Sequence, residues 1–220
     1  MFLPIVLTIL LAVHGSYAQT CRTVATGQFY STLSFSVKSA SVITTRVRMD
    51  PNTASYVFPP TELQGQMCSY SWNKLWGATR CGYFADNHKD SDRFMWRRVP
   101  TCLIYSASGT VIGQNTNCSE ANLIEICAAA YDNGVRPYEN EGTLLKQFST
   151  KLQVNVWYRL TLRFSSSQTI YELADSANVL IESQTINHRT CSNFNQGSMQ
   201  NLYFGGQCAA PQPVTVCYAS

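Results

Sequence analysis

Hydrophobic and polar residues alternate along several stretches of this chain, which is the pattern of a β-strand with one buried face. The alternation is clearest over residues 154–164, where apolar and aromatic side chains occupy every second position. The same pattern predicts further strands over residues 33–38, 43–49, 170–173, 179–181 and 213–218. Residues 174–178 are turn formers, so we expect the strands on either side of them to form a hairpin.

Helical patterns are scarce. Only residues 120–130 predict a short helix, with Ser119 as its N-cap. Residues 132–142 are rich in Gly, Pro and Asn and predict a long loop. The chain contains no internal repeat and no interdomain linker. We therefore expect one all-β domain built from two packed antiparallel sheets.

The first 18 residues predict a secretory signal peptide. Residues 2–13 form an uncharged apolar run, and Ser16-Tyr17-Ala18 is a small-x-small cleavage site. No other apolar run approaches the roughly 20 residues that span a bilayer. We expect residues 1–18 to be removed and residues 19–220 to form a single secreted, extracellular domain with no membrane attachment.

The cysteine content fits this compartment. The chain has nine cysteines, at positions 21, 68, 81, 102, 118, 127, 191, 208 and 217. In a secreted chain this predicts up to four disulfides and one remaining thiol, which leaves open a bond between chains and hence the oligomeric state. The spacings match no zinc pattern, so no metal is expected. Asn117-Cys118-Ser119 is an N-glycosylation sequon, although a disulfide at Cys118 would restrict its use.

The charge distribution is more informative than the net charge of +3, which comes from 16 basic and 13 acidic residues. No stripe of basic and aromatic residues indicates a nucleic-acid partner. Three pairs of arginines instead lie two or four residues apart in predicted strands, and each pair would project from one strand face. Either each of these faces is simply solvated, or together they form a concave basic face that binds polyanions. The pairs are Arg46 with Arg48, Arg93 with Arg97, and Arg159 with Arg163.

The segment 91–98 (SDRFMWRR) carries the strongest functional signal. As a strand, it would point Ser91, Arg93 and Arg97 to one face. A turn near residues 99–100 would lead into a second strand that places Tyr105 on the same face, and Lys74 would arrive from an upstream segment. A hydroxyl, guanidinium groups and a phenol on one surface suit an anionic sugar.

Several segments, in this order, resemble polysaccharide lyase family 14, the alginate lyases of marine molluscs and of a chlorella virus. The matching segments are residues 44–49 (TTRVRM), 73–77 (NKLWG), 91–97 (SDRFMWR), Tyr105, 157–159 (WYR) and 202–206 (LYFGG). The resemblance runs from about residue 28 to the end of the chain, and the 91–97 segment is its most specific part. It implies a jelly-roll β-sandwich, stapled here by disulfides, with a groove on its concave sheet.

The active site of that family consists of a Lys, a Ser, an Arg and two Tyr separated by one residue. The resemblance therefore implies catalytic roles for Lys74, Ser91, Arg93 and Tyr105. This chain departs from the family pattern at two positions. Ala107 stands where the second Tyr is expected, and Trp76 replaces the usual Pro of the 73–77 segment.

These residue types suit β-elimination in a polyuronate. Arg93 or Lys74 would neutralise the sugar carboxylate and stabilise the enolate-like intermediate, while Tyr105 would remove the C5 proton and Ser91 would orient the groups. No cofactor is needed. We expect the remaining arginines to bind the polymer: Arg97, Arg46, Arg48, Arg159 and Arg163.

Two functions remain open at this stage. The first is a secreted lyase acting on alginate or a related polyuronate. The second is a catalytically inactive protein of the same fold that binds acidic polysaccharide or belongs to an extracellular matrix. Ala107 favours the second function, whereas the retained spacing of Ser91, Arg93 and Tyr105 favours the first.

Overall fold

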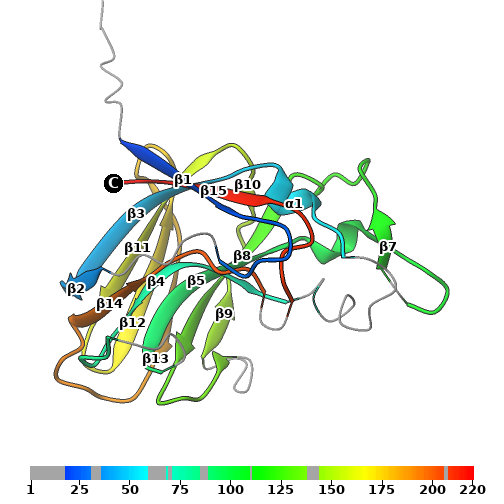
Figure 1. Cartoon of the computed structure of the whole chain (residues 1–220). Coiled ribbons are helices and arrows are strands. Elements are labelled where there is room, and N and C mark those ends of the chain that lie inside the picture. The colour runs from blue at the N-terminus through cyan, green and yellow to red at the C-terminus, as the bar shows by residue number, and fades with distance from the viewer. Residues whose placement is uncertain are drawn as a thin grey trace, which may run out of the picture.

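The computed structural model describes residues 18–30, 36–58, 68, 71–84, 89–109, 111–137, 144–205 and 208–220. Its strands form two large sheets and one small hairpin (Figure 1). The pairings between these strands are antiparallel. The predicted fold class is confirmed: the protein is an all-β, disulfide-stapled jelly-roll sandwich.

One large sheet has six strands. In spatial order they are β1 (Gln19–Val24), β15 (Val214–Ala219), β3 (Val42–Met49), β11 (Trp157–Phe164), β12 (Gln168–Ala174) and β13 (Leu180–Asn187). The first and last strands of the chain are therefore neighbours. The hairpin predicted around residues 174–178 is confirmed as β12 and β13.

The other large sheet has seven strands. In spatial order they are β10 (Leu152–Gln153), β8 (Leu123–Tyr131), β5 (Ser91–Arg98), β4 (Asn73–Thr79), β14 (Gln196–Gln200) and β2 (Val37–Ser39), with β9 (Leu145–Gln147) paired to β8. The remaining elements are the helix α1 (Asn52–Ser55), the 3-10 turn η1 (Pro100–Cys102) and the hairpin strands β6 (Leu103–Tyr105) and β7 (Val111–Gln114).

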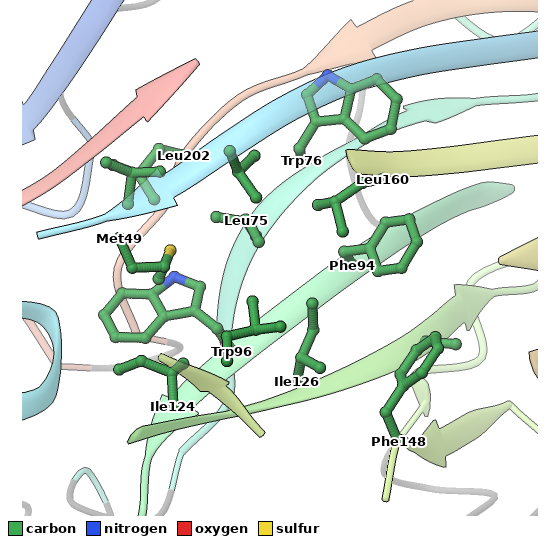
Figure 2. Close-up of a cluster of buried hydrophobic side chains, with 14 of the residues drawn as sticks. Met49, Leu75, Trp76, Phe94, Trp96, Ile124, Ile126, Phe148, Leu160 and Leu202 are labelled. Atoms are coloured by element: carbon green, nitrogen blue, oxygen red, sulfur yellow. The ribbon is translucent and has the colours of Figure 1, made fainter. Parts of the chain in front are cut away.

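The hydrophobic core lies between the two large sheets. Alternate residues of each strand point into it, as the sequence pattern predicts. Leu160 and Leu162 of β11 are fully buried against side chains such as Phe94 and Trp96 of β5. Figure 2 shows this packing, with rings from β5 beside aliphatic side chains of neighbouring strands. The opposite face of each sheet points away from the hydrophobic core.

Two sequence predictions need correction. Residues 120–130 are not a helix, because Leu123–Tyr131 form the strand β8, which pairs with β5, β9 and β10. The run of three alanines favours a helix, but pairing and burial in a central strand override this preference. The strand predicted over residues 154–164 begins only at Trp157, because Asn155 has a φ of 62° and turns the chain.

Other sequence predictions fall partly outside the described residues. The signal peptide lies almost entirely there, as do half of the segment 33–38 and part of the loop 132–142. Where the structure describes the chain, it has no helix long and apolar enough to cross a membrane.

Four disulfides and one free cysteine account for the nine cysteines, as predicted. The disulfides are Cys21–Cys217, Cys68–Cys208, Cys81–Cys191 and Cys102–Cys118, and the free thiol is the buried Cys127. Three of them join segments more than 100 residues apart, and constraining such long loops stabilises a fold most. Asn117 is exposed beside the bonded Cys118, and its glycosylation stays a prediction.

A buried ionic network joins the two sheets. The guanidinium of Arg80 lies 3.5 Å from Asp92 and 2.9 Å from Asp132, and Arg80 and Asp92 are fully buried. Arg80 also donates a hydrogen bond to the carbonyl of Tyr131. From the opposite sheet, the Tyr171 hydroxyl donates to Asp92 at 2.8 Å. Burial and the Asp92 charge raise the pKa of Tyr171, so this phenol stays a donor.

Replacing Arg80 should strongly destabilise the protein. Arg80→Met leaves Asp92 buried without its cation, which costs about 3–5 kcal/mol. The change would be measured as the free energy of unfolding in urea. Lys151→Met is the matched control, because its ion pair with Glu120 is partly exposed and should contribute only about 0–1 kcal/mol. Equal losses in the two variants would contradict the importance of the network.

Lys38 is a second buried cation beside this network. Its side chain is 2% exposed, and its ammonium donates to the Phe194 carbonyl at 2.7 Å. The ammonium also lies 3.8 Å from the centre of the Phe164 ring. Burial lowers the pKa of Lys38 from 10.5 to about 8, although the charge of Asp92 opposes the shift.

Lys38 should therefore make stability rise between pH 8 and 10.5. In this window the unfolded chain, where the Lys38 pKa is near 10.5, binds more protons than the folded chain, where it is about 8. Stability then increases as the pH rises. Urea unfolding across this window should show a rise in the native protein that is weaker in Lys38→Met. Parallel curves for the two proteins would disprove the shifted titration.

Candidate functional site

The face of β5 that points away from the core carries the predicted functional residues. Phe94 and Trp96 point into the core, so Ser91, Arg93 and Arg97 lie on the opposite face. This placement is confirmed. The neighbouring strands β4 and β8 lie on either side of β5 and extend the same surface.

Lys74 reaches this surface from β4. It pairs with Met95 of β5, and a bulge follows between Lys74 and Trp76. On its other side, the backbone of Lys74 exchanges two hydrogen bonds with Tyr203, of 2.9 and 3.0 Å. The ammonium lies 4.6 Å from the centre of the Tyr203 ring and 5.4 Å from that of Tyr131. The bulge and this bridge together place one ammonium between two phenols.

Arg93 completes the group. Its Nε lies 3.4 Å from the hydroxyl of Ser91, and it donates through Nη2 to Gln200 at 3.0 Å. Its guanidinium carbon lies 5.4 Å from the centre of the Tyr131 ring. Tyr131 therefore has two cations near its ring, and it pairs with Ser91 across the sheet. We call the following six residues the Lys74 cluster: Lys74, Ser91, Arg93, Tyr131, Gln200 and Tyr203.

Most of the Lys74 cluster is buried. The exposed fraction is 4% for Lys74, 0% for Ser91 and 1% for Arg93. Tyr131 is also buried, whereas Gln200 and Tyr203 are half-buried. Burial, with a smaller contribution from Tyr30, raises the pKa of Tyr203. The Tyr203 phenol is therefore protonated at neutral pH.

Aromatic rings connect the cluster with the surface. The ring of Tyr203 lies 5.9 Å from that of Phe29 and 6.3 Å from that of Tyr30. Tyr30 is 46% exposed, so the three rings run from the buried Lys74 toward solvent.

Arg97 lies further along the same face and has local partners. It forms an ion pair with Glu125 at 2.7 Å and stacks 4.3 Å from the centre of the Trp72 ring. Between Arg97 and the cluster, Met95, Cys127 and Ala129 form a small buried apolar group. The predicted role of Arg97 in substrate binding stays a prediction.

The structure does not bring Tyr105 into the cluster. Tyr105 lies on β6, which pairs with β7 and not with β5, so the expected shared face is wrong. The turn η1 and the disulfide Cys102–Cys118 redirect the chain after β5. The phenol of Tyr105 is close enough to Arg98 to influence its pKa, and Arg98 belongs to the opposite face of β5 from Arg93.

The predicted continuous basic face is also wrong. Arg46 and Arg48 lie on β3 and Arg159 and Arg163 on β11, both in the six-stranded sheet. Val47 and Leu160 of these strands point into the core, so the arginines point outward on the far side of the sandwich from Lys74. Alternation identified outward positions, but it contains no information on which sheet a strand joins.

Sequence reasoning missed three members of the cluster: Tyr131, Gln200 and Tyr203. Tyr131 directly follows the segment 120–130 that was mistaken for a helix, although its two-residue spacing from Ala129 and Cys127 is the signal of a shared strand face. Tyr203 lies in the 202–206 segment of the resemblance, but no role was assigned to it. Within the described residues, no group of three His, Cys, Asp or Glu side chains is placed to hold a metal.

A cavity of about 300 Å³ lies elsewhere, between the edges of the two sheets. Arg22, Thr45, Trp76, Met199 and Tyr218 are among its lining residues, and none of the cluster residues line it. The cavity and the Lys74 cluster are therefore separate features.

Comparisons with known proteins show limited similarity. No family model matches the sequence, and no characterised protein matches it by sequence. Among solved structures, the chain is similar to the alginate lyase vAL-1 from Chlorella virus, with a TM-score of 0.42, 9% identity and coverage of 93% of this chain and 91% of that one. It is also similar to the kappa-carrageenase from Pseudoalteromonas carrageenovora in complex with an oligotetrasaccharide of kappa-carrageenan, with a TM-score of 0.32, 8% identity and coverage of 80% and 60%. These values carry no information on the chemistry of the cluster.

Gly77 should be required for the geometry of the cluster. It pairs with Arg93, and an added Cβ would lie 2.0 Å from the Asp92 carbonyl oxygen. Gly77→Ala forces β4 and β5 apart and should cost about 1–3 kcal/mol in the free energy of unfolding. Gly113→Ala in β7 is the control, because its Cβ would meet only the end of the Ile104 side chain, at 3.8 Å. An unchanged urea midpoint for Gly77→Ala would contradict the proposed close approach.

Proposed function

We propose that this protein is a secreted polysaccharide lyase that cleaves an acidic, uronate-containing polymer by β-elimination at the Lys74 cluster. The observation that carries the proposal is that Lys74 and Arg93 lie beside two phenols, Tyr131 and Tyr203. These two phenols supply the acid and the base. Ala107, which stands where the resemblance places the second Tyr, supplies neither. The four disulfides are typical of proteins from oxidising compartments, which supports secretion.

Each side chain of the cluster has its own role in β-elimination. Lys74 and Arg93 bind the sugar carboxylate and stabilise the negative charge that develops when the C5 proton leaves. Tyr131, whose ring lies beside both cations, accepts that proton as the general base. The electron pair of the C5–H bond forms the C4=C5 double bond, and the C4–O bond breaks.

The leaving oxygen needs a proton, and Tyr203 is placed to donate it. Burial keeps the pKa of Tyr203 raised, so its phenol is in the acid form at neutral pH. The proton that Tyr131 accepted compensates for the proton that Tyr203 lost, and solvent restores both groups. Ser91 and Gln200 hold the guanidinium of Arg93 and thereby position it.

The burial of the cluster favours a second candidate function. Lys74, Ser91 and Arg93 are at most 4% exposed, so a polymer has to displace covering groups before it reaches them. A protein whose cluster stays closed would bind acidic polysaccharide at its surface without cleaving it. This second function would require no proton transfer by Tyr131 or Tyr203.

Ultraviolet absorbance separates the two functions. The protein without residues 1–18 would be incubated with alginate, polymannuronate, polyguluronate and glucuronan, and the absorbance of the conjugated double bond followed with time. We expect a rising signal on at least one polymer. Tyr131→Phe and Tyr203→Phe should each reduce the rate by about 10²–10⁴-fold, since each removes one acid–base group and keeps the ring.

Tyr105→Phe tests the sequence-based assignment against the structural one. It also removes a phenol hydroxyl, but from β6, and should leave the rate within about twofold of the native protein. Loss of activity in Tyr105→Phe alone would overturn the assignment of Tyr131 and Tyr203. A flat trace on all four polymers, combined with binding to any of them, would establish the non-catalytic function.

A further inference from the structure

The outward face of the six-stranded sheet carries a compact group of cations. Arg46 of β3 lies directly opposite Arg159 of β11, and Arg48 lies opposite Trp157 in the same pair of strands. The guanidinium of Arg48 is 5.3 Å from the centre of the Trp157 ring. We call these four residues, Arg46, Arg48, Trp157 and Arg159, the Arg159 patch.

Like charges that face each other across two strands destabilise a sheet. Four other arginines of the described structure form ion pairs with carboxylates: Arg80 with Asp92 and Asp132, Arg97 with Glu125, Arg163 with Glu172 and Arg189 with Asp90. The direct pairing of Arg46 with Arg159 places two like charges opposite each other on neighbouring strands.

Arg46 donates hydrogen bonds to the Ser176 carbonyl at 3.1 Å and to the Asn178 Oδ1 at 3.0 Å, whereas those of Arg48 and Arg159 are longer. Arg48 donates to the disulfide sulfur of Cys217 at 3.5 Å, and sulfur is a poor acceptor. Arg159 reaches the Asn178 carbonyl at 3.5 Å. The Nε atoms of both Arg48 and Arg159 are buried and have no hydrogen-bond acceptor among the described residues. A guanidinium has five donors, so both side chains retain capacity for an anionic ligand.

The surroundings of the patch are hydroxylated. Thr44 and Thr161 lie on the same outward face of β3 and β11, with their hydroxyls 3.1 Å apart. Thr23 and Thr215 form a similar pair on β1 and β15. Hydroxyls beside arginines suit a hydrated sugar chain that carries negative groups, because both partners offer donors and acceptors.

We propose that the Arg159 patch binds the carboxylate or sulfate groups of an acidic polysaccharide, as a second site on the opposite face of the sandwich from the Lys74 cluster. Arg46, Arg48 and Arg159 hold the anionic groups, and the half-buried indole of Trp157 supplies an apolar contact for a sugar ring. The ligand relieves the repulsion between Arg46 and Arg159. The site holds a polymer and performs no chemistry, so it does not depend on lyase activity.

The test uses polymers that no lyase can cleave by β-elimination at a uronate. Binding of dextran sulfate and of carboxymethyl dextran to the full chain would be measured by isothermal titration calorimetry, with neutral dextran as the reference. We expect both charged polymers to bind and neutral dextran not to bind. Binding of only one charged polymer would identify which anionic group the site prefers and would support the proposal.

Arg159→Gln and Arg163→Gln form a matched pair of variants. Both residues lie on β11, point outward and carry one charge, but Arg163 is already paired with Glu172. Arg159→Gln should weaken binding about tenfold, and Arg163→Gln less than about twofold. Equal weakening in both variants would mean that only the general charge of the face acts, and would overturn the site.

Thermal unfolding supplies a second readout. Without ligand, Arg159→Gln should keep or raise the melting temperature, because it removes one of two facing charges. Dextran sulfate should raise the melting temperature of the native protein more than that of Arg159→Gln, since a ligand stabilises the state it binds. A lower melting temperature for the unliganded variant would make Arg159 a structural residue.

Stronger binding to anionic phospholipid vesicles than to either polymer, lost in Arg159→Gln, would assign the patch to a membrane surface instead.

Discussion

The buried guanidinium of Arg80 is the interaction on which the rest of this structure depends. It holds the carboxylates of Asp92 and Asp132 and the carbonyl of Tyr131, and so fixes the ends of three adjacent strands, β4, β5 and β8. Tyr171 reaches Asp92 from the other sheet, which links the two layers through the same charge. Ser91 and Tyr131, at these strand ends, belong to the Lys74 cluster. The position of the candidate site is thus determined by an ion pair on the core side of the sheet.

The two outward faces of the sandwich hold their cations in different ways. In the Lys74 cluster, an ammonium and a guanidinium are buried among aromatic rings and amides, where charge acts strongly because water is excluded. In the Arg159 patch, the guanidinium groups are half-buried on an outer surface, where salt screens them more effectively. The first environment suits the stabilisation of a transition state, and the second suits reversible attraction of a polymer. The net charge of +3 does not show that the cations occupy these two different environments.

Sequence periodicity was sufficient for β3, β11, β12 and β15 and for the face of β5 that carries Ser91 and Arg93, because side-chain direction follows from position along a strand. The number of cysteines, nine, allowed four disulfides and one free thiol to be predicted. Periodicity could not assign strands to sheets, so Arg46 and Arg159 were expected on the wrong side of the sandwich. Tyr105 was misplaced because one turn, η1, diverts the chain into a separate hairpin. Tyr131 was missed because three alanines before it favour a helix until tertiary pairing overrides them.

The position of β15 has a consequence for how the protein is made. This strand, residues 214–219, lies between β1 and β3, so the N-terminal strand gains its sheet neighbour only when nearly the whole chain has been synthesised. Until then β3 presents an open edge on that side, and the thiols of Cys21, Cys68 and Cys81 await partners from the last 30 residues. A ribosome-bound chain therefore cannot close this sandwich progressively from its beginning. The six-stranded sheet and three of the four disulfides are complete only once β15 and the segment before it have joined the fold.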